Sequence, residues 1–139
     1  MIALMLAASL SWCPQSATWV TCDVMSDGQR DRIREALSTY VLETPDCVEV
    51  RDGILAWLER KAFVFVYTAH TEDSDSSWVA GETIRDTASG RALGFGLHAH
   101  SLRLPMRQLA GIAMHEGVHL FELVSHEANA ERLQRSCVR

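Results

Sequence analysis

The sequence contains no apolar stretch that approaches the ~20 residues needed for a membrane-spanning helix. It contains no run of Lys or Arg, and thirteen basic residues against eighteen acidic ones give a net charge of −5. This balance argues against nucleic acid or an anionic membrane as a general partner. Internal repeats and domain linkers are absent as well. What is present is a chain of 139 residues, 47% hydrophobic and 22% charged, which fits one globular domain.

The N-terminus lacks the basic residues that usually begin a secretory signal peptide. Residues 2–10 nevertheless form an apolar run that is typical of the central region of such a peptide. Cleavage after Ala17 would leave residues 18–139 as a single domain in a secreted or periplasmic protein. The alternative is a buried N-terminal helix or strand in a cytoplasmic protein.

The four cysteines lack CxxC spacing. Cys13, Cys22, Cys47 and Cys137 are scattered along the chain, which does not match a zinc ribbon. In an exported protein, cysteines of this kind tend to form disulfides. The sequence alone does not select a connectivity.

Apolar periodicity predicts helices on both sides of a group of strands. Apolar residues recur at helical spacing over residues 27–43, with Ser26 or Asp27 as the N-cap and Pro45 after the end. A shorter helical segment follows at residues 54–60. Near the C-terminus, Pro105 can begin a long apolar helix in its first turn.

The middle of the chain is rich in strand-forming residues. The β-branched and aromatic run at residues 62–67 predicts a buried strand. Residues 78–85 and 91–97 predict two more strands, and Gly94 and Gly96 suit a strand that another backbone approaches closely. Together with the helices, these segments predict an α+β domain with a small mixed sheet.

The most informative segment is His115-Glu116-Gly117-Val118-His119, which lies within the predicted C-terminal helix. Residues four apart share a helix face, so both imidazoles can reach one metal ion. Imidazole nitrogen suits zinc, and Glu116 lies beside the pair, where it can take a proton from a zinc-bound water. A chain of this composition contains about 0.02 chance matches to the pattern, which favours a real metal site.

A catalytic zinc usually takes three protein ligands and one water, so the histidine pair needs a third partner. His126 and Glu127 are candidates downstream. In an unbroken helix, His126 would lie about 10 Å beyond His119, at 1.5 Å per residue. A turn near Ser125 would instead bring a second helix back towards the metal and present one carboxylate.

The HExxH helix and the following segment Glu127-Ala128-Asn129-Ala130-Glu131 resemble the zincin metallopeptidases, and within them the gluzincins. Several gluzincin families carry an ExxA[D/N] element on a second helix. The resemblance implies Glu127 as the third zinc ligand, in preference to His126, and Glu131 as an acceptor that orients a zinc-ligating imidazole. The chain departs from the pattern at Glu131, where Asp or Asn is usual. Only seven residues separate His119 from Glu127, fewer than is typical.

The same resemblance implies a minimal zincin-like fold, in which the strand before the active-site helix forms the rim of the substrate cleft. Residues 91–97 occupy that place, and an extended peptide could pair with the edge of this strand. His98 and His100 follow it on the surface or at the rim. One of them could contact the substrate or a developing oxyanion.

These observations predict a zinc metalloendopeptidase-like hydrolase that acts on a peptide or protein substrate. His115, His119 and Glu127 would hold Zn²⁺, and Glu116 would serve as general base and later as proton donor. The alternative is a non-catalytic zinc-binding or interaction module on a zincin scaffold. Glu116 argues against this alternative, because a structural zinc needs no free carboxylate at that position.

Overall fold

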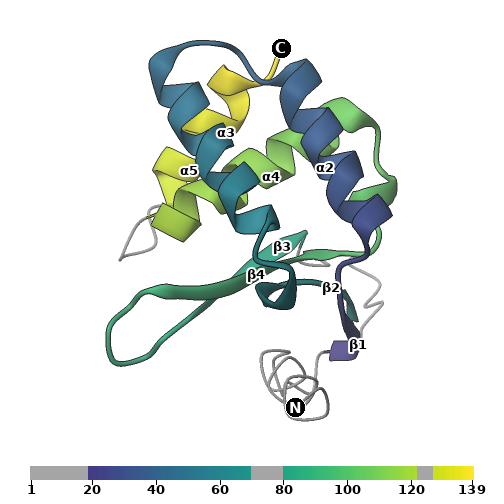
Figure 1. The fold of residues 1–139 in the computed structure, drawn as a ribbon. Helices are drawn as coiled ribbons and strands as arrows, with labels where there is room; N and C mark the ends of the chain where they lie inside the picture. The colour runs from purple at the N-terminus through teal and green to yellow at the C-terminus, as the bar shows by residue number, and fades with distance from the viewer. Residues whose placement is uncertain (1–18, 70–79, 122–126) are drawn as a thin grey trace.

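The structure, a computed structural model, describes residues 19–69, 80–121 and 127–139. Within these residues the chain forms four α-helices on one face of a four-stranded mixed sheet, which confirms the predicted α+β class (Figure 1). None of the helices described is long and apolar enough to cross a membrane. The elements in chain order are β1 (Trp19–Val24), α2 (Asp27–Tyr40), α3 (Pro45–Leu58), η1 (Lys61–Phe63), β2 (Val64–Ala69), β3 (Gly81–Arg85), β4 (Ala92–His98), η2 (Ser101–Arg103), α4 (Met106–Phe121) and α5 (Glu127–Cys137).

The sheet has the strand order β1-β2-β4-β3. Strands β2 and β4 are parallel, whereas β1 pairs antiparallel with β2 and β3 pairs antiparallel with β4. The prediction that residues 91–97 form the cleft rim is therefore wrong. Strand β4 is paired on both sides, and its Phe95 and Leu97 are fully buried in the core. The edge strand next to the HExxH helix is β3.

The two glycines of β4 have the role expected from the sequence. A Cβ at Gly94 would lie 2.7 Å from the carbonyl oxygen of Phe63, and one at Gly96 would lie 2.4 Å from the Phe65 ring. Any side chain at these positions would displace β2 or the turn before it. The glycines thus allow β2 and β4 to lie side by side.

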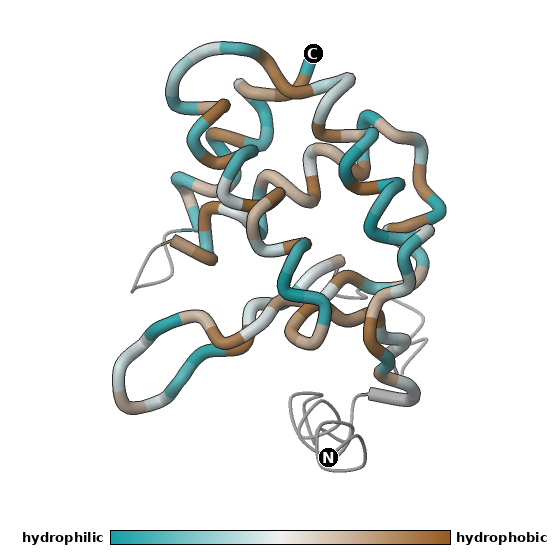
Figure 2. Tube along the Cα trace, viewed as in Figure 1, coloured by the Kyte–Doolittle hydropathy of each residue, from teal (hydrophilic) through white to brown (hydrophobic). Residues whose placement is uncertain are grey.

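Helix α2 is amphipathic. Ser26 caps it through a reciprocal pair of hydrogen bonds with Gln29. Ile33, Ala36 and Leu37 face the core, and hydrophilic positions alternate with hydrophobic ones along the helix (Figure 2). The helix ends at Tyr40, three residues before the predicted end, because Val41 adopts an extended backbone and forms an isolated β-bridge with Val138.

Two elements near the N-terminus differ from the prediction. Helix α3 begins at Pro45, nine residues before the predicted segment, because Pro45 is tolerated in the first turn and Thr44 takes the N-cap position. Cys47 in its first turn is bonded to Cys137 at the end of α5, which confirms the expected use of disulfides.

Strand β1 was not predicted. The signal-peptide prediction concerns residues that lie outside the described ranges.

Helix α4 runs through the centre of the molecule, between the sheet and the other three helices. Its Leu109, Ala110, Ala113 and Met114 are fully buried. A helix that is apolar around most of its circumference needs partners on several sides, which α2, α3, α5 and the sheet provide. Among the helices that the structure describes, the HExxH residues therefore lie on the most extensively packed one.

Candidate metal centre

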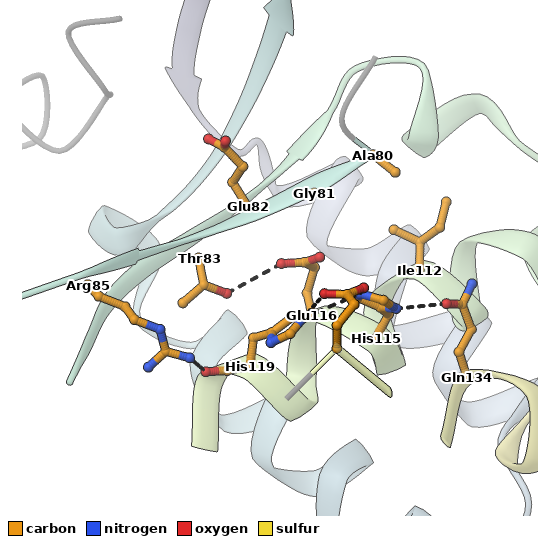
Figure 3. A pocket seen from close by; sticks show the side chains of 11 residues that line it. Ala80, Gly81, Glu82, Thr83, Arg85, Ile112, His115, Glu116, His119 and Gln134 are labelled. Atoms are coloured by element: carbon orange, nitrogen blue, oxygen red, sulfur yellow. Dashed lines mark hydrogen bonds and ion pairs between the residues drawn. The ribbon is translucent and has the colours of Figure 1, made fainter. Parts of the chain in front are cut away.

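A cavity of about 530 Å³ lies between strand β3 and helices α4 and α5 (Figure 3). The HExxH residues His115, Glu116 and His119 line it from α4, and Glu127 lines it from the first turn of α5. The segment 80–85 lines the opposite side. The predicted site residues on α4 and α5 thus meet in one solvent-accessible cavity.

Three potential ligand atoms converge in this cavity. His115 Nε2 lies 3.3 Å from His119 Nε2, and the two oxygens of Glu127 lie 2.7 Å from His115 Nε2 and 3.1 Å from His119 Nε2. In a tetrahedral zinc site with bonds of about 2.0–2.1 Å, neighbouring ligand atoms are separated by about 3.3–3.4 Å. The trio could therefore hold a metal ion after small adjustments.

Gln134 sets the tautomer of His115. Its Oε1 lies 2.9 Å from His115 Nδ1, so the imidazole donates its Nδ1–H proton to the amide oxygen. The lone pair of Nε2 then points at the Glu127 carboxylate, which also carries only lone pairs. Two acceptors at this distance need a cation between them, either a proton or a metal ion. The arrangement suits a metal because Nε2 of His119 faces the same point.

Glu116 lies in the same cavity but outside the trio of ligand atoms. The residue is 7% exposed, and burial raises the pKa of its carboxyl to about 7, although His115 and a hydrogen bond from Thr83 oppose this rise. The Thr83 hydroxyl, on β3, donates to Glu116 Oε1 over 3.3 Å. The carboxyl of Glu116 is thus held beside the ligand trio but is not one of the potential ligands.

The edge strand β3 supports Glu116 in a second way. A Cβ at Gly81 would lie 2.7 Å from Glu116 Cγ and 3.0 Å from its Cδ. Only glycine leaves room for the Glu116 side chain beneath the strand. Gly81 and Thr83 together define where the carboxyl lies.

Arg85 connects the same strand to the last turn of α4. Its guanidinium donates one hydrogen bond to the backbone carbonyl of His119 and another, of 2.9 Å, to the carbonyl of Gly90. Carbonyl groups in the last turn of a helix have no partner within the helix, and a cation is favourable there. Arg85 therefore fixes the distance between β3 and the turn that carries His119.

The remaining predicted residues lie elsewhere. Glu131, which was predicted to orient a ligating imidazole, is exposed and makes no hydrogen bond to His115 or His119. Gln134, one turn later on α5, makes that contact with His115 instead. His98 packs edge-on against Tyr67, and His100 is exposed, so neither lines the cavity. His126 and the proposed turn at Ser125 lie outside the described residues.

Sequence reasoning missed Thr83, Arg85 and Gln134. Residues two apart on a strand share a face, so the sequence could have predicted that Thr83 and Arg85 lie on the same side of their strand, whereas Glu82 lies between them. It could not have predicted that this side lies near α4, because that depends on the order of strands in the sheet. Gln134 is seven residues after Glu127, two turns along the same helix face, which was the available signal.

Comparison with models of known protein families, with curated proteins and with solved structures finds no match to this chain. Only the residues and the geometry of the site therefore indicate what the protein does.

Proposed function

We propose that this protein is a zinc-dependent metallopeptidase that hydrolyses peptide bonds. The observation that carries the proposal is the convergence of His115, His119 and Glu127 on one point, with the buried carboxyl of Glu116 beside it. Two imidazole nitrogens and one carboxylate are a typical donor set for catalytic zinc, which leaves a fourth position open. The resemblance to gluzincins is part of this proposal and is supported by the position of Glu127.

The chain's own residues have separable roles in the proposed reaction. When bound, zinc polarises a peptide carbonyl and makes water nucleophilic at neutral pH. The Glu116 carboxylate accepts a proton from the attacking water and then donates it to the leaving amine. Thr83 and Gly81 keep that carboxyl at its position, and Gln134 keeps Nε2 of His115 free of a proton.

Strand β3 offers a route for the substrate. In the part of the chain that the structure describes, only β4 pairs with it, so its other edge faces no strand there, and its residues line the cavity. An extended peptide could add to this edge as a further strand, which would bring a backbone carbonyl past the ligand trio. The rim predicted for residues 91–97 is thus reassigned to Gly81–Arg85.

The test combines metal analysis with peptide cleavage. We expect about one zinc per chain after reconstitution, and loss of zinc in His115→Ala and Glu127→Ala. Glu116→Gln should retain zinc and lose at least ~100-fold in peptide hydrolysis, the scale of general acid–base catalysis. A wild-type chain that binds no zinc, or a Glu116→Gln variant that cleaves as fast as wild type, would overturn the proposal. Wild type that binds zinc and cleaves no peptide would favour the non-catalytic module.

We also infer that the protein is exported to an oxidising compartment. The Cys47–Cys137 disulfide supports this, because such bonds persist outside the cytosol. Mass spectrometry without reductant, on protein recovered from its native compartment, should detect the cross-linked peptide pair. Free thiols at Cys47 and Cys137 in that material would contradict export.

A further inference from the structure

A second cavity, of about 440 Å³, lies at the N-terminal half of α4, where α5 ends. It shares Ile112 and Gln134 with the metal cavity. The two helices run antiparallel there, since Glu127 lies against His119 and Gln134 lies against Gly111 and His115. The two cavities are therefore neighbours along the seam between α4 and α5.

The second cavity is cationic. Arg107 and Arg135 line it, together with Gln108, and none of the described residues that line it is Asp or Glu. Neither arginine forms an ion pair with a carboxylate in the part of the chain that the structure describes. Arg107 lies over the ring of Tyr40, with 5.5 Å between its guanidinium carbon and the ring centre. This contact orients the guanidinium and leaves its hydrogen-bond donors available.

The lining of the metal cavity is different. Glu82, Glu116 and Glu127 line it, and Arg85 is the one arginine among its described lining residues. The residues lining the seam thus change from carboxyl groups at the HExxH site to guanidinium groups at the N-terminal end of α4. Since the whole chain carries a net charge of −5, the cationic cavity would act on a ligand by contact and not through a long-range field.

The spacing matches an extended peptide. Arg107 precedes His115 by eight residues, which corresponds to about 12 Å along the helix axis. An extended chain covers this distance with three to four residues, at about 3.3 Å each. A peptide whose scissile bond lies at the metal site would place a side chain or its C-terminal carboxylate between Arg107 and Arg135.

We propose that this second cavity is a specificity subsite that binds a carboxylate of the substrate three to four residues from the cleaved bond. The protein would accordingly prefer acidic peptides. This inference rests on the proposed peptidase function for the position of the bond that is cleaved. The binding preference itself is measurable without any turnover.

The first experiment measures binding to the zinc-loaded Glu116→Gln chain by fluorescence anisotropy. The probes are labelled degenerate decapeptide amides, one pool containing Asp and Glu and a matched pool containing Asn and Gln instead. We expect the acidic pool to bind about fivefold more tightly, which corresponds to one or two exposed charge pairs. A third pool, with Asn and Gln and a free C-terminal carboxylate, distinguishes a terminal carboxylate from an acidic side chain.

The variants Arg107→Gln and Arg135→Gln, singly and together, should reduce this preference, and the double variant should abolish it. Arg91→Gln is the matched control, since this exposed arginine precedes β4 and lines neither cavity. Equal binding of all pools, or a preference that survives in the double variant, overturns the subsite. If the preference holds while wild type cleaves no peptide, the subsite stands and the peptidase proposal fails. If wild type cleaves the neutral and acidic pools equally well, the peptidase proposal stands and the subsite fails.

Discussion

The imidazole of His115 can act as a ligand through Nε2 only when its proton is on Nδ1. Gln134 holds the proton there through a hydrogen bond of 2.9 Å, and Nε2 faces the point shared with His119 and Glu127. One amide oxygen thus controls both the orientation and the tautomer of the ring.

We therefore expect Gln134→Ala to lower zinc affinity by about 10–100-fold, the usual effect of removing a partner of a metal-ligating histidine. Glu131→Ala is the matched control on the same helix and should leave affinity within about twofold, because Glu131 is exposed. Competition with a chelator measures both. If Glu131→Ala were the more damaging change, the orienting role would return to Glu131.

Glu116 should make the stability of the metal-free protein depend on pH. Its pKa is raised from 4.5 to about 7 by burial, so the folded state favours the protonated form. The resulting stabilisation is complete below pH 4.5 and is lost as the pH rises through about 7. The Glu116→Gln variant has no titrating group at this position, so its stability lacks this decrease. Between pH 4 and pH 8, the free energy of unfolding of chelator-treated wild type should therefore fall by up to about 3 kcal/mol more than that of the chelator-treated variant, at ~1.36 kcal/mol per pKa unit.

Urea unfolding of both chelator-treated proteins at pH 4, 6 and 8 measures this difference. Subtracting the variant from wild type removes the contribution of titrating groups that do not interact with Glu116. A difference that stays constant across the three pH values would show that the Glu116 carboxyl is solvated in the folded protein.

Among elements, β3 links the sheet to the candidate site. It meets α4 at three points: Gly81 makes room for Glu116, Thr83 donates to the carboxyl, and Arg85 binds the carbonyl of His119. A short edge strand thus helps to fix the position of the proposed base, together with the helix that carries it.

Gly81→Ala should therefore impair the proposed hydrolysis while sparing zinc binding. The new methyl group would overlap Glu116 Cγ, which must then rotate away, whereas the ligand trio lies on α4 and α5. We expect at least a tenfold loss in kcat with zinc affinity near wild type. Gly28→Ala in α2 is the control, since a Cβ there meets nothing within 4 Å. Equal kcat values for the two variants would contradict the role of β3.

The elements with strong local patterns were predictable from the sequence. Apolar periodicity marked α2 and α4, and β-branched and aromatic residues marked β2. The order of strands was not predictable, because the parallel pairing of β2 with β4 depends on contacts across the sheet. Local helix spacing was enough to predict His115, Glu116 and His119 as candidate site residues. The contacts of Thr83 and Arg85 with α4 depend on the position of β3 in the sheet, so they could not be predicted.

At the scale of the whole molecule, the Cys47–Cys137 disulfide joins α3 to the end of α5 across 90 residues. It holds α5, which carries Glu127 and Gln134, against the rest of the helical layer. Its pairing could not be chosen from the sequence, since four cysteines allow three full connectivities.

Reduction of this bond should destabilise the fold by about 2–5 kcal/mol, because a cross-link over a long loop restricts the unfolded chain. The Cys47→Ser/Cys137→Ser double variant should show the same loss without reductant. Urea unfolding of oxidised wild type and of the double variant measures it. A double variant as stable as oxidised wild type would mean that packing alone fixes α5.

The contacts that build the site differ greatly in their separation along the chain. The ligand trio joins residues four, eight and twelve positions apart, and the Gln134 contact spans nineteen. The contacts of β3 with Glu116 and His119 span thirty-three and thirty-four. Closing a short loop costs less entropy than closing a long one, so the α4–α5 hairpin can assemble before the sheet docks on it. During folding, the three potential metal ligands would then come together first, and the proposed base would reach its position later, when β3 encloses Glu116.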